Sequence, residues 1–196
     1  MVQRFPAARE IDMTAIRTIP IERLDDTAFL PFGRVLGSAY PTDASATAYR
    51  DPRSDFWHVH DFDPGVGGQT EVLWVNYRNA SLRITALEAH WLTEQAVVPL
   101  GSGLVHVVCA SLEDGSRRPD LQRMRAFHID VGQGVCMRPG CWHTSFVRGG
   151  ETTCMMLTRR STTKELVAHL AAETVAVETS IMELTSLEAV ALARPG

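Results

Sequence analysis

Between residues 56 and 159 the sequence is a succession of short apolar segments separated by turn residues. The turns include DPGVGG, LGSG, DVGQG and RGG. Many short strands at this spacing, with no helix between them, predict an antiparallel β-sandwich or barrel. Strands are expected near residues 56–60, 70–77, 82–90, 95–100, 104–110, 123–130, 134–138, 143–147 and 151–159.

The residues before this stretch are less regular. Residues 1–18 have a mixed composition and are expected to form an N-terminal arm. The segment IPIERLDDTAFLPFGRVL, residues 19–36, predicts a strand, a short helix capped near Asp25 or Asp26, and a return strand. Residues 37–55 are rich in Ser, Pro, Thr and Asp, which predicts a long loop.

The residues after the β-rich stretch begin with a predicted helix over 162–173. The following tail is apolar but ambiguous in period, and we expect it to cover a sheet edge or to pack on a second subunit. A chain of 196 residues suits one main domain. We predict that this domain spans 19–160, with a C-terminal helical extension over 161–196.

Composition and charge exclude several classes of protein. A hydrophobic fraction of 45% and a charged fraction of 21% are typical of a globular chain. The net charge of −4 argues against nucleic acid as the main partner. No apolar signal segment follows the opening MVQRFPAARE, and the longest uncharged run, residues 96–112, contains a proline and two glycines. We therefore expect a soluble cytoplasmic protein without a membrane partner.

Cysteine and lysine usage narrows the chemistry further. The four cysteines lack any C-x-x-C spacing, so buried free thiols are expected in preference to a zinc site or disulfides. Arginine accounts for eighteen of the nineteen basic residues, and the only lysine, Lys164, lies near the start of a predicted helix. Schiff-base catalysis is therefore not expected, and an anion would be bound by arginine, whose planar guanidinium suits a carboxylate.

Two ionisable residues lie close together in the segment LEAHWLTEQAVVPLGSG, residues 87–103. Side chains two residues apart on a strand point to the same face of the sheet, so Glu88 and His90 lie on one face. Burying both is costly unless something pairs with them. Glu88, His90, Glu94 and Gly101 match the spacing of the first metal-binding motif of cupin barrels, with Glu88 replacing its first histidine.

The second cupin motif is a glycine, then two other residues, then a histidine, and Gly140-Cys141-Trp142-His143 supplies it. We predict a metal site formed by Glu88, His90, Glu94 and His143, with a donor set suited to nickel, manganese, iron or zinc. Many cupins have one more residue before the acidic position, which would select Gln95 instead of Glu94. The alternative is that Glu88 and His90 form a satisfied core or surface pair without a metal.

A competing histidine pair lies upstream in Phe56-Trp57-His58-Val59-His60-Asp61. It lacks a matching pattern of carboxylate and glycine downstream. We interpret it as one strand face near the mouth of the barrel, where His60 or Asp61 contacts substrate.

Several motifs resemble the ureidoglycolate lyase family. The strings PDL at 119–121, RAF at 125–127, GQGV at 132–135 and WH at 142–143 resemble its C-terminal core. Leu87-Glu88-x-His90 with Gln95 and Pro99 resembles the family's L-E-x-H…Q…P pattern. Weaker similarity, at Asn76-Tyr77-Arg78, His60-Asp61 and 28–35, extends the resemblance over roughly residues 19–160.

This resemblance implies an all-β fold, a cupin-type antiparallel β-barrel or double-stranded β-helix, with short helical additions at both ends. It implies a homodimer that cleaves ureidoglycolate into glyoxylate and urea, in ureide nitrogen salvage, with an associated divalent cation. The sequence departs from the family near the site. Met137-Arg138-Pro139 replaces a tyrosine-histidine-arginine run, Thr144 replaces a second histidine, and Trp91 replaces a proline. Glu94 stands where small residues are common. These departures bear on the substrate, since they fall at the site.

The chemistry assigns a role to each candidate. Cleaving the hemiaminal requires proton removal from its hydroxyl and a proton for the departing urea nitrogen. We predict His90, His143 and Glu88 as cation ligands, with Glu94 as a further ligand or the base, so that Glu94, His90 and His143 are the catalytic set. Contacts to the small carboxylate substrate are predicted for Arg138, Arg78, Gln95 and His60. The alternatives are a cupin enzyme acting on another small hydroxy- or keto-acid, and a non-catalytic cupin that binds a small acid.

Overall fold

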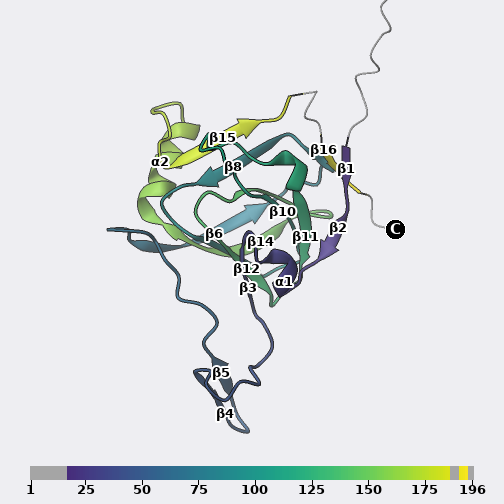
Figure 1. Ribbon diagram of the computed structural model, residues 1–196, viewed down its shortest axis with the longest axis vertical. Coiled ribbons are helices and arrows are strands. Elements are labelled where there is room, and N and C mark those ends of the chain that lie inside the picture. Colours follow the sequence, from purple (N-terminus) through teal and green to yellow (C-terminus); the bar gives the residue numbers. More distant parts are fainter. Residues whose placement is uncertain (1–16, 186–189, 194–196) are drawn as a thin grey trace, which may run out of the picture.

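The computed structural model describes residues 17–185 and 190–193. Its strands form two large sheets, a small third sheet and a projecting hairpin (Figure 1). In spatial order, the six-stranded sheet contains β15 (Thr179–Glu183), β8 (Ala86–His90), β13 (Trp142–Phe146), β10 (Leu104–Cys109), β11 (Arg125–Ile129) and β2 (Ile21–Arg23). The five-stranded sheet contains β3 (Gly33–Leu36), β12 (Gly134–Met137), β9 (Gln95–Pro99), β14 (Thr152–Arg159) and β6 (Thr70–Tyr77).

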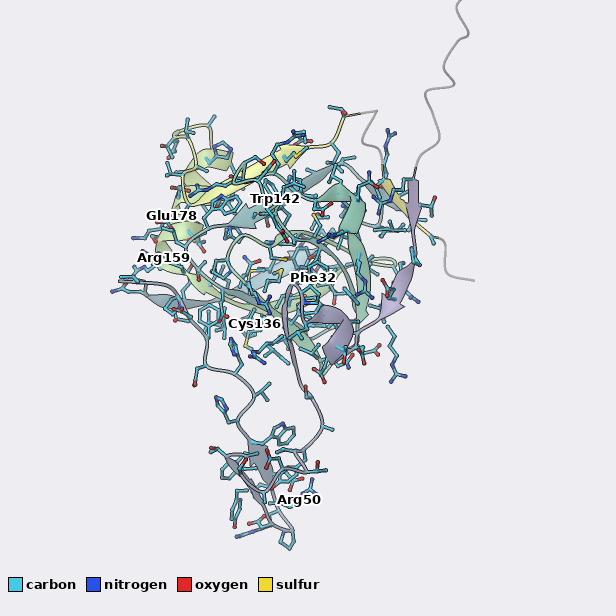
Figure 2. The ribbon with its side chains drawn as sticks, in the orientation of Figure 1. Phe32, Arg50, Cys136, Trp142, Arg159 and Glu178 are labelled. Atoms are coloured by element: carbon cyan, nitrogen blue, oxygen red, sulfur yellow. The ribbon has the colours of Figure 1, made fainter. Side chains whose placement is uncertain are left out.

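Smaller elements surround these two sheets. The three-stranded sheet contains β1 (Arg17–Ile19), β16 (Val190–Leu192) and β7 (Arg83–Ile84), and β4 (Ala48–Arg50) pairs with β5 (Asp55–Trp57). The helices are α1 (Asp26–Phe29), α2 (Arg160–Leu170) and the 3₁₀ turn η1 (Leu121–Arg123). The hairpin β4–β5 projects away from the sheets, and Arg50 marks its far part (Figure 2).

The core occupies both faces of the six-stranded sheet. On β10, Leu104 and Val108 belong to the cluster shared with the five-stranded sheet, and Val105 and Val107 belong to a second cluster with β1 and β16. This division follows from the strand period of two. Because both faces are covered, every residue of β10 is buried, and any polar side chain on its inner face must find a partner.

The predicted all-β fold is confirmed, with two facing sheets that are not hydrogen-bonded into one closed barrel within the described residues. Each predicted strand between 56 and 159 has a counterpart. The short helix is also present, and Asp25 caps it by accepting a hydrogen bond from the Ala28 amide at 2.9 Å. The four cysteines are buried and free, as expected.

Three details of the flanking segments differ from prediction. The segment 37–55 contains β4, and helix α2 begins at Arg160. In the predicted helical extension 161–196, only the part up to Leu170 is helical, because the tail supplies β15 to the edge of β8 and β16 to the sheet with β1 and β7. The predicted arm 1–18 lies outside the described residues except for Arg17 and Thr18, which are in β1.

No helix among residues 17–185 and 190–193 combines the length and the apolar character needed to span a membrane.

Candidate active site

Histidine and glutamate side chains gather on the inner face of the six-stranded sheet. Glu88 and His90 alternate with the core residues of β8, and His143 alternates with those of β13. The two strands are paired so that His143 lies opposite Glu88. The period of a strand and the pairing of β8 with β13 therefore bring together three of the predicted metal ligands.

The imidazoles of His90 and His143 are oriented through their Nδ1 atoms. His143 donates a hydrogen bond from Nδ1 to the Cys141 carbonyl at 3.0 Å, so its Nε2 is the nitrogen that faces Glu88. His90 Nδ1 lies 3.0 Å from Thr179 Oγ1, on β15. Both Nε2 atoms are buried and lack a hydrogen-bond partner in the described part of the chain. An imidazole held in this way is typical of a metal-ligating histidine.

Glu88 completes the group. Its Oε1 lies 3.5 Å from His143 Nε2, and the ligand atoms of Glu88, His90 and His143 all lie within 4.8 Å of one another. Two buried nitrogen atoms without partners beside a carboxylate are the donor set that a divalent cation requires. The residues therefore fit a cation, which would take the place of the 3.5 Å contact between His143 Nε2 and Glu88 Oε1.

The protonation states also suit ligation. Burial lowers the pKa of His90 to about 4, with a further lowering from His143 that Glu88 opposes. Burial acts to raise the pKa of Glu88, but the imidazoles, His143 first, lower it on balance to about 2. At neutral pH the group therefore contains an ionised carboxylate and a neutral His90, which are the states that bind a metal.

A third histidine, His106, faces the same interior but has both ring nitrogens engaged. Its Nδ1 lies 3.0 Å from Ser145 Oγ and its Nε2 lies 3.0 Å from Met137 Sδ. Its ring packs beside that of His143, with the centroids 5.6 Å apart. Burial lowers the pKa of His106 to about 3, so it is a neutral side chain that supports His143.

A pocket of about 200 Å³ opens beside the cluster. It is lined by Tyr77, Ala86, Leu87, Glu88, His143, Thr144, Ser145 and Ile181. Burial raises the pKa of Tyr77, although a hydrogen bond with Ser145 opposes the shift, so the phenol keeps its proton. Sites for drug-sized molecules measure about 300–1,000 Å³, so this pocket suits a substrate of few atoms.

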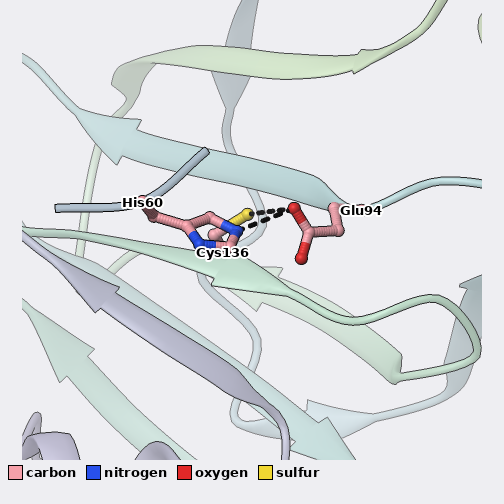
Figure 3. Close-up of side chains that lie close together, drawn as sticks. All are labelled: His60, Glu94 and Cys136. Atoms are coloured by element: carbon pink, nitrogen blue, oxygen red, sulfur yellow. Dashed lines mark hydrogen bonds and ion pairs between the residues drawn. The ribbon is translucent and has the colours of Figure 1, made fainter. Parts of the chain in front are cut away.

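Glu94, the fourth predicted ligand, is not part of this group. Its carboxylate instead contacts His60 and Cys136 (Figure 3), with His60 Nε2 2.8 Å from Oε2. The reason is structural, because Glu94 precedes β9 in the five-stranded sheet and its amide hydrogen-bonds to the Asp63 carbonyl. The prediction that Glu94 shares a site with Glu88, His90 and His143 is corrected in this respect.

The predicted substrate contacts are dispersed. Arg138 donates hydrogen bonds to the Leu30 and Pro31 carbonyls, and Arg78 pairs with Glu151 at an exposed position. Neither residue lines the pocket beside Glu88. Gln95 is buried at the start of β9, opposite Met137.

The competing histidine pair is divided as well. His58 pairs with Asp61 at 3.3 Å on the surface, whereas His60 contacts Glu94. The two histidines therefore do not converge on one site.

Tyr77, Ser145 and Thr179 were absent from the predicted site. Ser145 could have been found, because it lies two residues after His143 and so faces the same side of a strand. Tyr77 ends a predicted strand, but its closeness to Glu88 depends on how the two sheets face each other. Thr179 belongs to the tail, where no strand was predicted.

A model of one protein family, described as ureidoglycolate lyase, matches residues 16–178 of this chain. The chain belongs to the ureidoglycolate lyase family. The match covers every described residue of the cluster and the pocket except Thr179 and Ile181.

Curated relatives carry the same name. The ureidoglycolate lyase of Burkholderia mallei is 29% identical over 146 residues, which cover 74% of this chain and 84% of that protein. The ureidoglycolate lyase of Rhodobacter capsulatus is 32% identical over 123 residues, covering 63% and 74% of the two chains. The ureidoglycolate lyase of Pseudomonas aeruginosa is 33% identical over 133 residues, covering 65% and 75%.

Among solved structures, an epimerase of Mycobacterium tuberculosis is 15% identical and covers 69% of this chain and 65% of its own, with a TM-score of 0.42.

Proposed function

We propose that this family member cleaves ureidoglycolate into glyoxylate and urea in the pocket beside Glu88. Membership of the ureidoglycolate lyase family supports the substrate. The observation that carries the proposal is the pair of buried, unpartnered Nε2 atoms of His90 and His143 next to that pocket. A small acid bound there would meet His143 and Glu88 in the pocket lining, with His90 behind them in the same cluster.

Glu88, His90 and His143 would hold a divalent cation, for which nickel, manganese, iron and zinc all suit the donor set. When bound, the cation would supply positive charge that acidifies the substrate hydroxyl and attracts its carboxylate. The chain offers no substitute for that charge at this place, because none of the described residues lining the pocket is arginine or lysine. A carboxylate ligand and a cation are therefore expected to bind together.

Two side chains can move the protons of the reaction. Glu88 is ionised, so its carboxylate could accept the hydroxyl proton as well as help to hold a cation. The hydroxyl O–H and the C–N bond then break, and the C=O bond of glyoxylate forms. The urea nitrogen takes a proton from the Tyr77 phenol, which regains one from Glu88. Because Glu88 has a low pKa, it is a weak base, and proton transfer depends on prior acidification of the hydroxyl.

The test compares urea release by the wild type with that by His90→Ala and His143→Ala. Each variant is expected to lose activity by about 10²-fold or more, because the cation and the acidified hydroxyl are lost together. His169→Ala, on exposed helix α2, is the matched control and should retain wild-type activity. Full activity in His143→Ala would contradict the proposal.

A second reading is an enzyme acting on another small hydroxy- or keto-acid. The observation that favours it is that Arg138, one of the departures from the family, contacts backbone carbonyls rather than the pocket. A panel of such acids separates the two readings, since turnover of another acid without urea from ureidoglycolate supports the second. Thermal-shift binding without turnover of any acid supports the non-catalytic alternative.

The predicted homodimer stays a proposal. Analytical ultracentrifugation would test it, because a dimer has twice the 21.6 kDa mass of one chain. The cytoplasmic location likewise stays a prediction.

A further inference from the structure

A second cluster of metal-binding side chains lies outside the candidate active site. It contains His60 from the segment after the hairpin β4–β5, Glu94 from the residue just before β9 and Cys136 from β12 (Figure 3). Strands β9 and β12 are hydrogen-bonded neighbours, with Cys136 opposite Ala96. The fold thus fixes two of the three residues on one sheet, and His60 reaches them from a separate segment.

The three donor atoms already lie at nearly the spacing of a bound ion. His60 Nε2 lies 2.8 Å and Cys136 Sγ lies 3.7 Å from Glu94 Oε2, and the ligand atoms all lie within 4.8 Å of one another. Ligands of one tetrahedral zinc ion lie ~3.3–3.8 Å apart, given the usual zinc–ligand bond lengths. Small side-chain movements would therefore bring all three atoms onto one ion.

The backbone around Glu94 is held in place independently of any ion. The Asp63 amide donates to Glu94 Oε2 at 2.9 Å, and the Glu94 amide donates to the Asp63 carbonyl at 3.0 Å. Thr93 Oγ1 donates to the Glu94 carbonyl at 2.6 Å. A carboxylate fixed by such outer contacts loses little freedom when it ligates a metal, which favours binding.

We propose that His60, Glu94 and Cys136 form a second divalent-cation site, selective for zinc-like ions, distinct from Glu88–His90–His143. The donor set of imidazole nitrogen, carboxylate oxygen and thiolate sulfur favours such ions over magnesium or calcium, which prefer oxygen ligands alone. The thiolate and carboxylate together balance the two positive charges of the ion. Three protein ligands leave a fourth position for water or a small ligand.

Binding requires one proton to leave the site. Burial and the Glu94 carboxylate raise the pKa of Cys136 to about 12, so the free thiol is protonated at neutral pH. The incoming ion replaces the sulfur-bound proton, which passes to solvent. The Nε2 hydrogen of His60, which now faces Glu94 Oε2, is also given up. A neutral ring regains a hydrogen at Nδ1, so that Nε2 can bind the ion. The ion would join the segment after the hairpin to the five-stranded sheet.

The test is titration of the metal-free protein with cobalt(II), a spectroscopic substitute for zinc. The wild type is expected to develop a near-ultraviolet thiolate-to-cobalt charge-transfer band, because Cys136 is the site's only sulfur ligand. Cys136→Ala should abolish the band. The matched control Cys154→Ala removes a buried thiol in β14 outside the cluster and should retain the band.

Two further variants separate this proposal from that of the active site. His143→Ala should retain the thiolate band while losing urea release, because it removes a ligand of the other cluster only. Glu94→Gln should weaken zinc binding at least about tenfold, measured by competition with a chromophoric chelator, while circular dichroism confirms an unchanged fold. Absence of the band in the wild type, or its persistence in Cys136→Ala, would overturn the proposal.

Discussion

At the scale of single residues, the hydrogen-bond partner of a ring nitrogen decides what each buried histidine can do. His106 is satisfied at both nitrogens by Ser145 and Met137, whereas His90 and His143 are satisfied only at Nδ1. The alternation of a strand predicts that such residues face inward, but it does not identify the atoms opposite each ring. The sequence therefore indicated His90 and His143 as ligands, and it could not show that His106 is a supporting residue.

Tyr77 is the residue whose role is most easily separated from binding. Tyr77→Phe removes the phenol that would protonate the leaving nitrogen while keeping the ring that lines the pocket. We expect kcat for urea release to fall by about 10²-fold with little change in KM, since general acid catalysis contributes roughly 10²–10⁴-fold. Steady-state kinetics measure both constants, and Tyr49→Phe, on the exposed hairpin, is the control. A raised KM at unchanged kcat would show that Tyr77 only binds substrate.

At the scale of secondary-structure elements, the central strands were predictable and the tail was not. Strands β6 to β14 follow from short apolar segments, many of them bounded by glycine-containing turns, which is a local signal. In the tail, β15 exists because its backbone pairs with the edge of β8, so that Thr179 lies opposite His90. That pairing joins segments almost ninety residues apart, as the hydrogen bond between Thr179 and His90 does. Local periodicity contains no information about such a pairing.

Strand β15 is expected to influence the active site through one hydroxyl group. Thr179→Val keeps the shape of the side chain but removes the oxygen 3.0 Å from His90 Nδ1. We expect the affinity for the cation proposed at Glu88, His90 and His143 to fall about 10–100-fold, because outer contacts orient metal-ligating histidines. Calorimetric titration of the metal-free protein measures it, and Thr179→Ser should restore most of the loss. Equal cation affinity in wild type and Thr179→Val would remove this positioning role.

At the scale of the whole molecule, Arg125 adds side-chain contacts to the strand pairing that joins the N-terminal segment to the sheet core. Arg125 on β11 forms an ion pair with Glu22 on β2 and donates to the Ala28 carbonyl in α1 at 2.8 Å. The RAF motif indicated family membership but not this contact, because the partner residues lie about a hundred positions away.

This ion pair predicts a pH dependence of stability. The hydrogen bond from Arg125 lowers the pKa of Glu22 below its ordinary value of 4.5, against the effect of burial. A carboxyl group with a lower pKa in the folded chain adds stability above its unfolded pKa and loses it as pH falls through the folded value. Wild type should therefore exceed Glu22→Gln in free energy of unfolding at pH 7, and the difference should narrow below pH 4.5.

Urea denaturation at stepped pH measures the difference between the two proteins. Glu173→Gln removes an exposed carboxylate beyond helix α2, and its difference from wild type in free energy of unfolding should not narrow comparably at acidic pH. If the difference in free energy of unfolding between wild type and Glu22→Gln is constant from neutral to acidic pH, the proposed link between the ion pair and stability is contradicted.

The placement of Thr179 has a consequence for biosynthesis. During translation, His90 and His143 leave the ribosome well before the residue that orients the first of them. A nascent polypeptide released before residue 179 would carry both imidazoles yet leave one of them free to rotate. Premature termination products should therefore load metal poorly, even when most of the two large sheets has formed, and the candidate site is complete only after the last strands are synthesised.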